Sequence, residues 1–126
     1  MNGRRQVTCT LIGIIVFIVA IMVVTIGSTE AAGPKKFTLI NVVFDGTKIW
    51  LPGSITVQQG DEVELTLINK LEVPHGFKID VFGIESVIAA QSKSTVKFKA
   101  KTAGVHPYIC HIHPPHIGGQ IHVIAK

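Results

Sequence analysis

The chain has 126 residues, with 12 basic and 8 acidic side chains and a formal net charge of +4. Two of the basic residues are Arg4 and Arg5, which leaves ten lysines against eight acids in the rest of the chain, a net charge of +2. So small an excess excludes the strongly basic surface of a nucleic-acid-binding protein. The length suits one folded domain rather than two.

The segment from Val7 to Gly27 contains no charged residue and consists largely of aliphatic side chains. As a helix it is long enough to cross about 30 Å of hydrocarbon. The two arginines precede it, and positive residues stay on the cytoplasmic side, so we expect residues 28–126 on the periplasmic or extracellular side of the cell membrane. Residues 1–27 are therefore predicted to be a single-pass membrane anchor or an uncleaved signal, and cleavage of this helix stays an open question.

The chain has two cysteines, Cys9 in this apolar segment and Cys110 near the C-terminus. A disulfide between them would have to cross the boundary of the bilayer, so Cys110 is predicted to be an unpaired thiol. In an oxidising compartment a free thiol is normally buried or ligated. Cys110 is therefore a candidate functional residue.

Residues 28–36 have the composition of a linker, with Gly33-Pro34, and residues 37–126 are predicted to form the folded domain. Within it, short runs rich in β-branched and aromatic residues alternate with turn signals such as Asp45-Gly46, and no convincing helical period occurs. The predicted extended segments are Phe37–Phe44, Lys48–Leu51, Ser54–Gln58, Glu62–Asn69, Gly76–Ile84, Ser86–Ala90, Thr95–Lys101, Val105–Cys110 and Gln120–Ala125. The pattern predicts an all-β fold, an antiparallel sandwich of Greek-key type.

The segment after the strand ending at Cys110 carries the chemistry. A thiol and two imidazoles follow one another at intervals of three residues, as Cys110, His113 and His116, with two prolines between the histidines. Thiolate and imidazole together are the donors of copper electron-transfer sites, because they accommodate both oxidation states. The prolines restrict the backbone and so favour one loop geometry.

The pattern Cys-x-x-His-Pro-x-His, with Gly-Gly-x-Ile-x-Val opening the next strand and Pro74-His75-Gly76-Phe77 upstream, resembles the cupredoxin family. The short loop is similar to the amicyanin type, in which the position of His116 is normally an axial Met. The resemblance implies a cupredoxin-like β-sandwich holding one copper ion. It implies His75, Cys110 and His113 as ligands, with His116 at an altered axial position.

The stretch from Val73 to Ile124 is also similar to nitrosocyanin and to the dicopper domain of cytochrome oxidase subunit II. Nitrosocyanin supplies a Glu at the place of His75, so its spectral type and open coordination position do not transfer with the resemblance. The dicopper domain needs a second Cys where this chain has Pro114. We therefore expect a mononuclear site.

The remaining histidines and lysines have simpler interpretations. His111 would point away from Cys110 if strand alternation continued, and is expected to be exposed. His106 is expected to pack in or near the core rather than to bind metal. The alternating lysines between residues 93 and 101 are expected to form a solvated strand face.

These features predict an electron carrier rather than an enzyme, transferring single electrons to and from redox partner proteins at the outer face of the membrane. The alternative is a nitrosocyanin-like copper protein with an open site for nitrogen oxides or redox catalysis. Copper delivery, copper storage or zinc binding is a third hypothesis, because Cys with three His also suits tetrahedral zinc. The sequence predicts no nucleic-acid partner and leaves homo-oligomer formation open.

Overall fold

The computed structural model describes residues 33–113 and 116–126; the predicted membrane anchor and most of the predicted linker lie outside them. The described residues form nine strands and one 3-10 turn, η2 (Asp80–Phe82). The strands are β1 (Lys35–Phe44), β2 (Thr47–Leu51), β3 (Ser54–Gln58), β4 (Glu62–Asn69), β5 (His75–Ile79), β6 (Ile84–Ile88), β7 (Lys93–Lys99), β8 (Gly104–Tyr108) and β9 (Gly119–Ile124). Within these two ranges, no helix has the length and hydropathy to span a bilayer.

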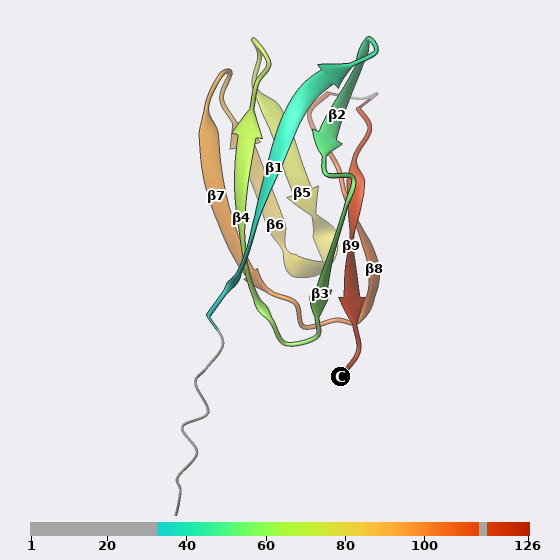
Figure 1. Ribbon diagram of the computed structural model, residues 1–126. Coiled ribbons are helices and arrows are strands. Elements are labelled where there is room, and N and C mark those ends of the chain that lie inside the picture. The colour runs from blue at the N-terminus through green and yellow to red at the C-terminus, as the bar shows by residue number, and fades with distance from the viewer. Residues whose placement is uncertain (1–32, 114–115) are drawn as a thin grey trace, which may run out of the picture. The chain divides into compact units, whose positions relative to one another are not determined.

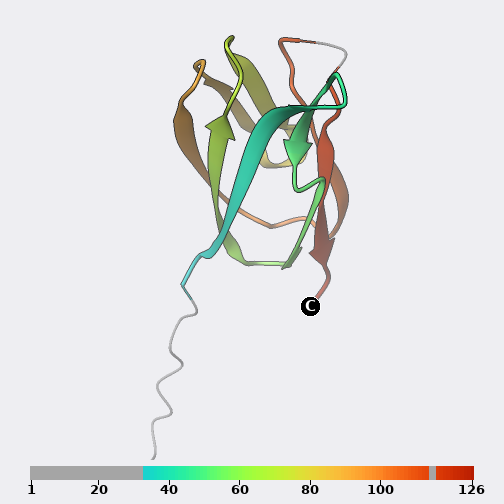
Figure 2. The same cartoon turned by 45° about the horizontal axis from the view of Figure 1, so that its top comes forward.

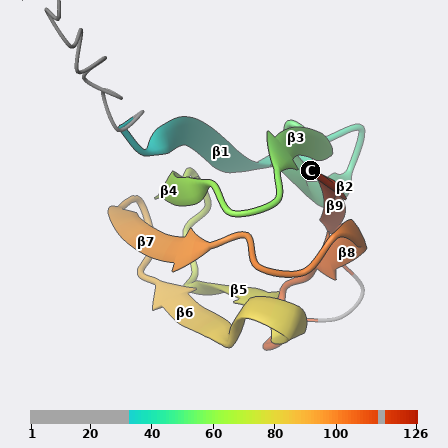
Figure 3. The same cartoon turned by 90° about the horizontal axis from the view of Figure 1, so that it is seen from below.

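The strands form three hydrogen-bonded sheets, in the orders β2-β1-β4-β7, β3-β9-β8 and β5-β6 (Figure 1). Seen along the strands, they surround one core, with β5 and β6 across from β1 (Figure 3). The expected sandwich is thus present, but its purely antiparallel pairing is wrong, because β1 pairs with β4 and β3 pairs with β9 in parallel. Parallel neighbours need a crossover connection. Here the chain passes from β1 to β2 in the same sheet, then to β3 in the sheet with β9 and β8, and then returns to β4.

Alternation of buried and exposed side chains defines the core. On β4, Val63, Leu65 and Leu67 are buried while the residues between them are partly exposed. The largest core side chains are aromatic: Trp50 meets Phe77 edge to face at a centroid distance of 5.4 Å, and Phe77 meets Tyr108 at 5.3 Å. The edge-to-face contact of Trp50 with Phe77 has the geometry that aromatic pairs prefer.

Two turns of the chain can be compared with the sequence: the one at Asp45-Gly46 was predicted, and the one at Gly83 was not. Asp45 and Gly46 join β1 to β2 with φ values of 47° and 74°, both in the left-handed region that such a two-residue hairpin turn requires. The predicted single segment Gly76–Ile84 instead contains most of β5, the turn η2 and the first residue of β6. β5 ends at Ile79, and after η2 the left-handed Gly83 (φ 64°) turns the chain into the antiparallel β6.

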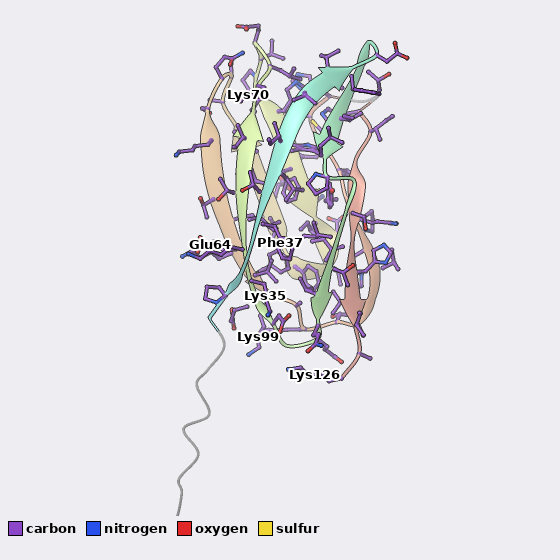
Figure 4. All side chains as sticks on the ribbon, in the orientation of Figure 1. Lys35, Phe37, Glu64, Lys70, Lys99 and Lys126 are labelled. Carbon is purple, nitrogen blue, oxygen red and sulfur yellow. The ribbon has the colours of Figure 1, made fainter. Side chains whose placement is uncertain are left out.

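The chain enters the sandwich at one end, and the loops with the candidate ligands lie at the other. The chain enters β1 at the end where Lys35 lies, whereas Lys70 lies at the opposite end, in the loop after β4 (Figure 4). Turning that opposite end forward shows the β1–β2 hairpin beside the segment leading to β9 (Figure 2). A parallel bridge between Ile49 and Ile117 joins these two segments. The loops with the candidate ligands gather at this end, away from the chain entry.

Candidate metal centre

His75 is the first residue of β5, and its side chain is fully buried. The loop before it is fixed by Asn69, whose Nδ2 donates to the carbonyls of Val73 (2.8 Å) and Ala89 (3.0 Å). The Oδ1 of Asn69 accepts a hydrogen bond from the backbone of Leu71 at 3.0 Å. Sequence reasoning missed this residue. Its position on the inward face of β4 was a usable signal, since a polar side chain there needs internal partners.

Cys110 is brought beside His75 by a backbone link between their strands. Ile109 donates to the carbonyl of Lys78 (3.0 Å) and accepts from its N–H (2.9 Å). This link places Cys110 Sγ 3.6 Å from Nδ1 of His75. The N–H of Gly76 donates to the same sulfur at 3.2 Å, and Cys110 is only 6% exposed.

His113 completes a cluster of three. One donor atom from each of His75, Cys110 and His113 lies within 4.8 Å of the others. The two imidazole rings are 4.8 Å apart between centroids. Nδ1 of His113 is buried and has no hydrogen-bond partner. Buried polar atoms without partners are uncommon in folded proteins, and a bound ligand is one explanation for them.

The donor atoms fit a transition-metal ion. Metal–sulfur and metal–nitrogen bonds of about 2.3 and 2.0 Å at a tetrahedral angle separate the two donors by about 3.5 Å. The sulfur of Cys110 and Nδ1 of His75 are 3.6 Å apart, close to that separation. Burial, followed by the neighbouring His116, His113 and Lys48, lowers the pKa of His75 to about 4. Its imidazole is therefore neutral near pH 7 and keeps a lone pair for a metal. A thiolate with two imidazoles suits copper.

His116 lies beside this cluster but not in it. Its ring centroid is 5.2 Å from that of His75. However, its Nε2 is 2.9 Å from Oδ1 of Asn41, and its Nδ1 is 3.1 Å from the carbonyl oxygen of Ile117. The structure thus brings three of the four predicted ligands together, and ligation by His116 stays a prediction.

Two further histidines, His111 and His106, can be compared with their predicted places. His111 is not exposed as expected: its side chain is 18% exposed, with Nε2 3.7 Å from Oε1 of Glu85. Strand alternation ends before it, because β8 stops at Tyr108, and His111 lies against Gly76 of β5. His106 packs edge to face on Phe82 at 5.3 Å, as predicted, and does not join the cluster.

Comparison with known proteins identifies the family. Residues 14–123 match the family model described as the cupredoxin-like domain. The chain belongs to this family. The expected cupredoxin fold is thereby confirmed, whereas the specific similarity to nitrosocyanin stays a prediction.

Two enzymes are similar in sequence to part of this chain. Over 58 residues, 44% of this chain, the sequence is 41% identical to the nitrous-oxide reductases of Stutzerimonas stutzeri and Pseudomonas fluorescens. That stretch is 9% of either enzyme, so the likeness concerns a small part of them.

Solved structures share the fold. A copper nitrite reductase from Nitrosomonas europaea matches with a TM-score of 0.65 and 21% identity, covering 75% of this chain and 42% of that one. A copper-containing nitrite reductase from Thermus scotoductus matches with a TM-score of 0.63 and 23% identity, covering 75% and 28%. At these identities the likeness is one of fold.

Proposed function

We propose that this cupredoxin binds one copper ion through Cys110, His75 and His113, with His116 as a fourth donor, and carries single electrons at the outer face of the membrane. The observation that carries the proposal is the buried three-residue cluster, in which Sγ of Cys110 lies 3.6 Å from Nδ1 of His75. A bound copper ion supplies the one-electron couple between its two oxidation states. The protein supplies the donors and holds them in place.

The rigidity of the donors supports electron transfer. His75 sits on a strand that Lys78 and Ile109 tie to the Cys110 segment by two backbone hydrogen bonds. At the other side of the site, Ile117 donates to the carbonyl of Lys48 at 3.0 Å and so ties the loop to β2. Donors fixed in this way change position little between oxidation states, which keeps the reorganisation energy low.

The proposed redox partners would meet the end of the sandwich that carries the site. An aliphatic side chain lies within two residues of each candidate ligand, and these side chains are exposed: Val73, Ile109, Ile112 and Ile117. Exposed apolar side chains close together are typical of protein contact surfaces. The domain's outward location rests on the charge-free segment Val7–Gly27 and the arginines before it.

Optical and electron paramagnetic resonance (EPR) spectra of the full-length protein in detergent, loaded with Cu(II), test this proposal. We expect one copper per chain and an intense thiolate-to-copper absorption band. An imidazole in place of a thioether favours oxidised copper, so the reduction potential should be lower than in a His116→Met variant. Absence of the band, or tight binding of zinc with no redox-active copper, would refute the electron-transfer proposal.

A second candidate function is the binding of a small molecule such as a nitrogen oxide at the metal. It is favoured by one observation: both ring nitrogens of His116 face other polar atoms, which leaves the cluster with three donors. Azide or nitric oxide added to the copper-loaded protein should then change its optical spectrum. Spectra that do not respond to either molecule would remove the basis for this function.

A further inference from the structure

A cleft opens at the end of the sandwich where the chain enters β1, between the turn η2 and the last residues of β7. Its volume is about 340 Å³, near the lower limit for small-molecule sites. The cleft forms because the strands β6 and β7 lie side by side in different sheets, so no ladder of hydrogen bonds joins them. Figure 3 views the sandwich from this end, with η2 and the end of β7 facing the reader.

The apolar lining of the cleft is built around two aromatic rings. Phe82 of η2 and Phe98 of β7 stack with their centroids 4.8 Å apart and an angle of 17° between the rings. His106 packs edge to face on Phe82 at 5.3 Å and so supports it from the side. Val81 also lines the cleft and is 43% exposed. An open apolar wall of this kind favours a ligand with a hydrocarbon part.

Lysines make the same cleft positive. Lys97, Lys99 and Lys101 belong to its described lining, which includes no acidic residue. Nζ of Lys97 lies 3.1 Å from Oε2 of Glu64, and Nζ of Lys99 lies 3.6 Å from Oε1 of Glu62, but exposed pairs of this kind are weak. Lys101 forms no ion pair within the part of the chain that the structure describes. The ligand that fits should therefore carry a negative charge beside its hydrocarbon part.

The chain enters the domain close to this cleft. Lys35, the first residue of β1, is paired with Val63 of β4, and Val63 is paired with Phe98. Because neighbouring strands are about 4.8 Å apart, the backbone of Lys35 lies about 10 Å from that of Phe98. Figure 4 shows Lys35 and Lys99 at the same end of the molecule. Gly27, where the predicted anchor ends, is eight positions before Lys35, a reach of at most about 30 Å.

We propose that the cleft binds an anionic phospholipid of the membrane, with the phosphate of its headgroup beside the lysines and the beginning of an acyl chain against Val81 and Phe82. This inference rests on the proposed membrane location. A free phosphate ion would leave the apolar lining uncovered, and a neutral lipid would leave the lysines without an anion. His75 begins β5, whereas η2 follows its end, so a domain docked through the cleft turns its metal site toward partners in the aqueous space.

Three exposed substitutions, none of them at the metal site, separate the parts of this inference. Lys101→Gln removes one positive charge from the cleft, which should lower binding to an anionic lipid surface about 5-fold. Lys93→Gln is the matched control, because Lys93 is an exposed lysine at the other end of β7 and does not line the cleft. Val81→Gln changes no charge but replaces part of the apolar wall.

The experiment uses the metal-free, full-length, ¹⁵N-labelled protein in lipid nanodiscs that contain a trace of phosphatidylcholine with a nitroxide on its acyl chain. Discs of phosphatidylcholine alone are compared with discs of phosphatidylcholine and phosphatidylglycerol. We expect the amide signals of η2 and of residues 98–102 to broaden only when phosphatidylglycerol is present. The ratio of docked to undocked domain should fall about 5-fold in Lys101→Gln, fall also in Val81→Gln, and keep its wild-type value in Lys93→Gln.

Equal broadening in both kinds of disc would overturn the inference, as would equal losses in Lys101→Gln and Lys93→Gln, since the tether or the net charge would then explain the contact. Wild-type broadening in Val81→Gln would place the lipid outside the cleft and overturn it too. Inorganic phosphate tests the other source of the same chemistry: shifts of the cleft signals with phosphate, without broadening in phosphatidylglycerol discs, would mean that the cleft binds the free ion.

The same samples distinguish this inference from the proposed function. A protein that co-elutes with neither kind of disc would refute the membrane location and the lipid site together, whereas co-elution without broadening would overturn the lipid site alone. The copper spectrum is recorded on separate samples. Its absence would refute the copper site and leave the measurement on the metal-free protein unaffected.

Discussion

The backbone N–H of Gly76 donates a hydrogen bond to Sγ of Cys110 over 3.2 Å. Gly76 directly follows His75, so one dipeptide on β5 supplies both an imidazole and a donor to the sulfur. This hydrogen bond helps to hold the sulfur beside the imidazole, and cysteine binds metals through its sulfur. The glycine is also a steric requirement, because a Cβ built there would lie 2.6 Å from Nδ1 of His111 and 3.0 Å from its backbone nitrogen.

Gly76→Ala should therefore disturb the metal centre. The added methyl group must push His111 and its backbone away, and Cys110 is the residue directly before His111. We expect a loss of about 1–3 kcal/mol in the free energy of unfolding, the usual cost of overpacking. Copper affinity should fall by about 10-fold or more, as with other changes around metal ligands. Urea unfolding and Cu(II) titration of the thiolate band measure the two effects.

Gly53→Ala is the matched control for that variant. A Cβ at Gly53 has no atom within 4 Å, and the residue is not in the left-handed region. Its unfolding midpoint and copper titration should match those of the wild type. Equal losses in both variants would mean that any glycine replacement in the loops weakens the domain, and that contact with His111 is not the cause.

Removal of a single donor should abolish the copper spectrum of the full-length protein. Cys110→Ser removes the thiolate, so the intense absorption band should disappear, while His75→Ala and His113→Ala should weaken copper binding strongly. His106→Ala is the control, because His106 contacts Phe82 and the Thr102 carbonyl and takes no part in the cluster. A spectrum that survives Cys110→Ser would place the copper elsewhere.

The sequence alone predicts the features that depend on residues close together in the chain, such as the buried face of a strand and the donors of one loop. Alternation on β4 indicated which side chains face the core, and the three-residue spacing from Cys110 indicated a loop of metal donors. Cys110 and His113 are close along the chain, so their proximity in the structure needs few long-range contacts. His75 could be linked to them only through the resemblance to cupredoxins, since it is 35 positions from Cys110.

The features that sequence reasoning missed depend on distant partners. Alternation shows which face of a strand is buried but not which strand lies beside it, so the parallel pairs of β1 with β4 and β3 with β9 were not foreseen. Asn41 and His116 are 75 positions apart and meet only because β2 holds Ile117. His111 was assigned to the surface because the alternation was extended beyond the last paired residues.

Asn69→Leu should destabilise the domain more than any exposed substitution near it. The amide of Asn69 donates to the carbonyl of Val73 and accepts from the N–H of Leu71, and a leucine would take this partner from both groups. The carbonyl of Ala89 would keep only its hydrogen bond from the Ser92 hydroxyl. We expect a loss of about 2–4 kcal/mol, since each unsatisfied buried group costs about 1–3 kcal/mol. Urea unfolding of the metal-free protein measures it.

Ser92→Ala is the comparison for Asn69. The hydroxyl of Ser92 donates to the carbonyl of Ala89 at 2.8 Å, but this hydrogen bond is exposed, so water can replace it. Its loss should cost less than about 1 kcal/mol. If Asn69→Leu were no more harmful than Ser92→Ala, the loop before His75 would not depend on the buried amide.

Gly118→Ala should disturb the return of the chain into β9. A Cβ at Gly118 would collide with the carbonyl oxygen of Tyr108, a backbone atom that cannot turn aside as a side chain can. The backbone from His116 to Gly119 must then shift, although Ile117 is held by the carbonyl of Lys48 at 3.0 Å. We expect a loss of about 3 kcal/mol, at the upper end of overpacking costs, because neither side of the contact can yield easily. Thermal unfolding measures that loss, and the copper spectrum shows whether the shift reaches the metal centre. A variant with wild-type stability would mean that β8 and β9 can separate at this point at little cost, and that the close approach of Gly118 to Tyr108 does not hold the loop.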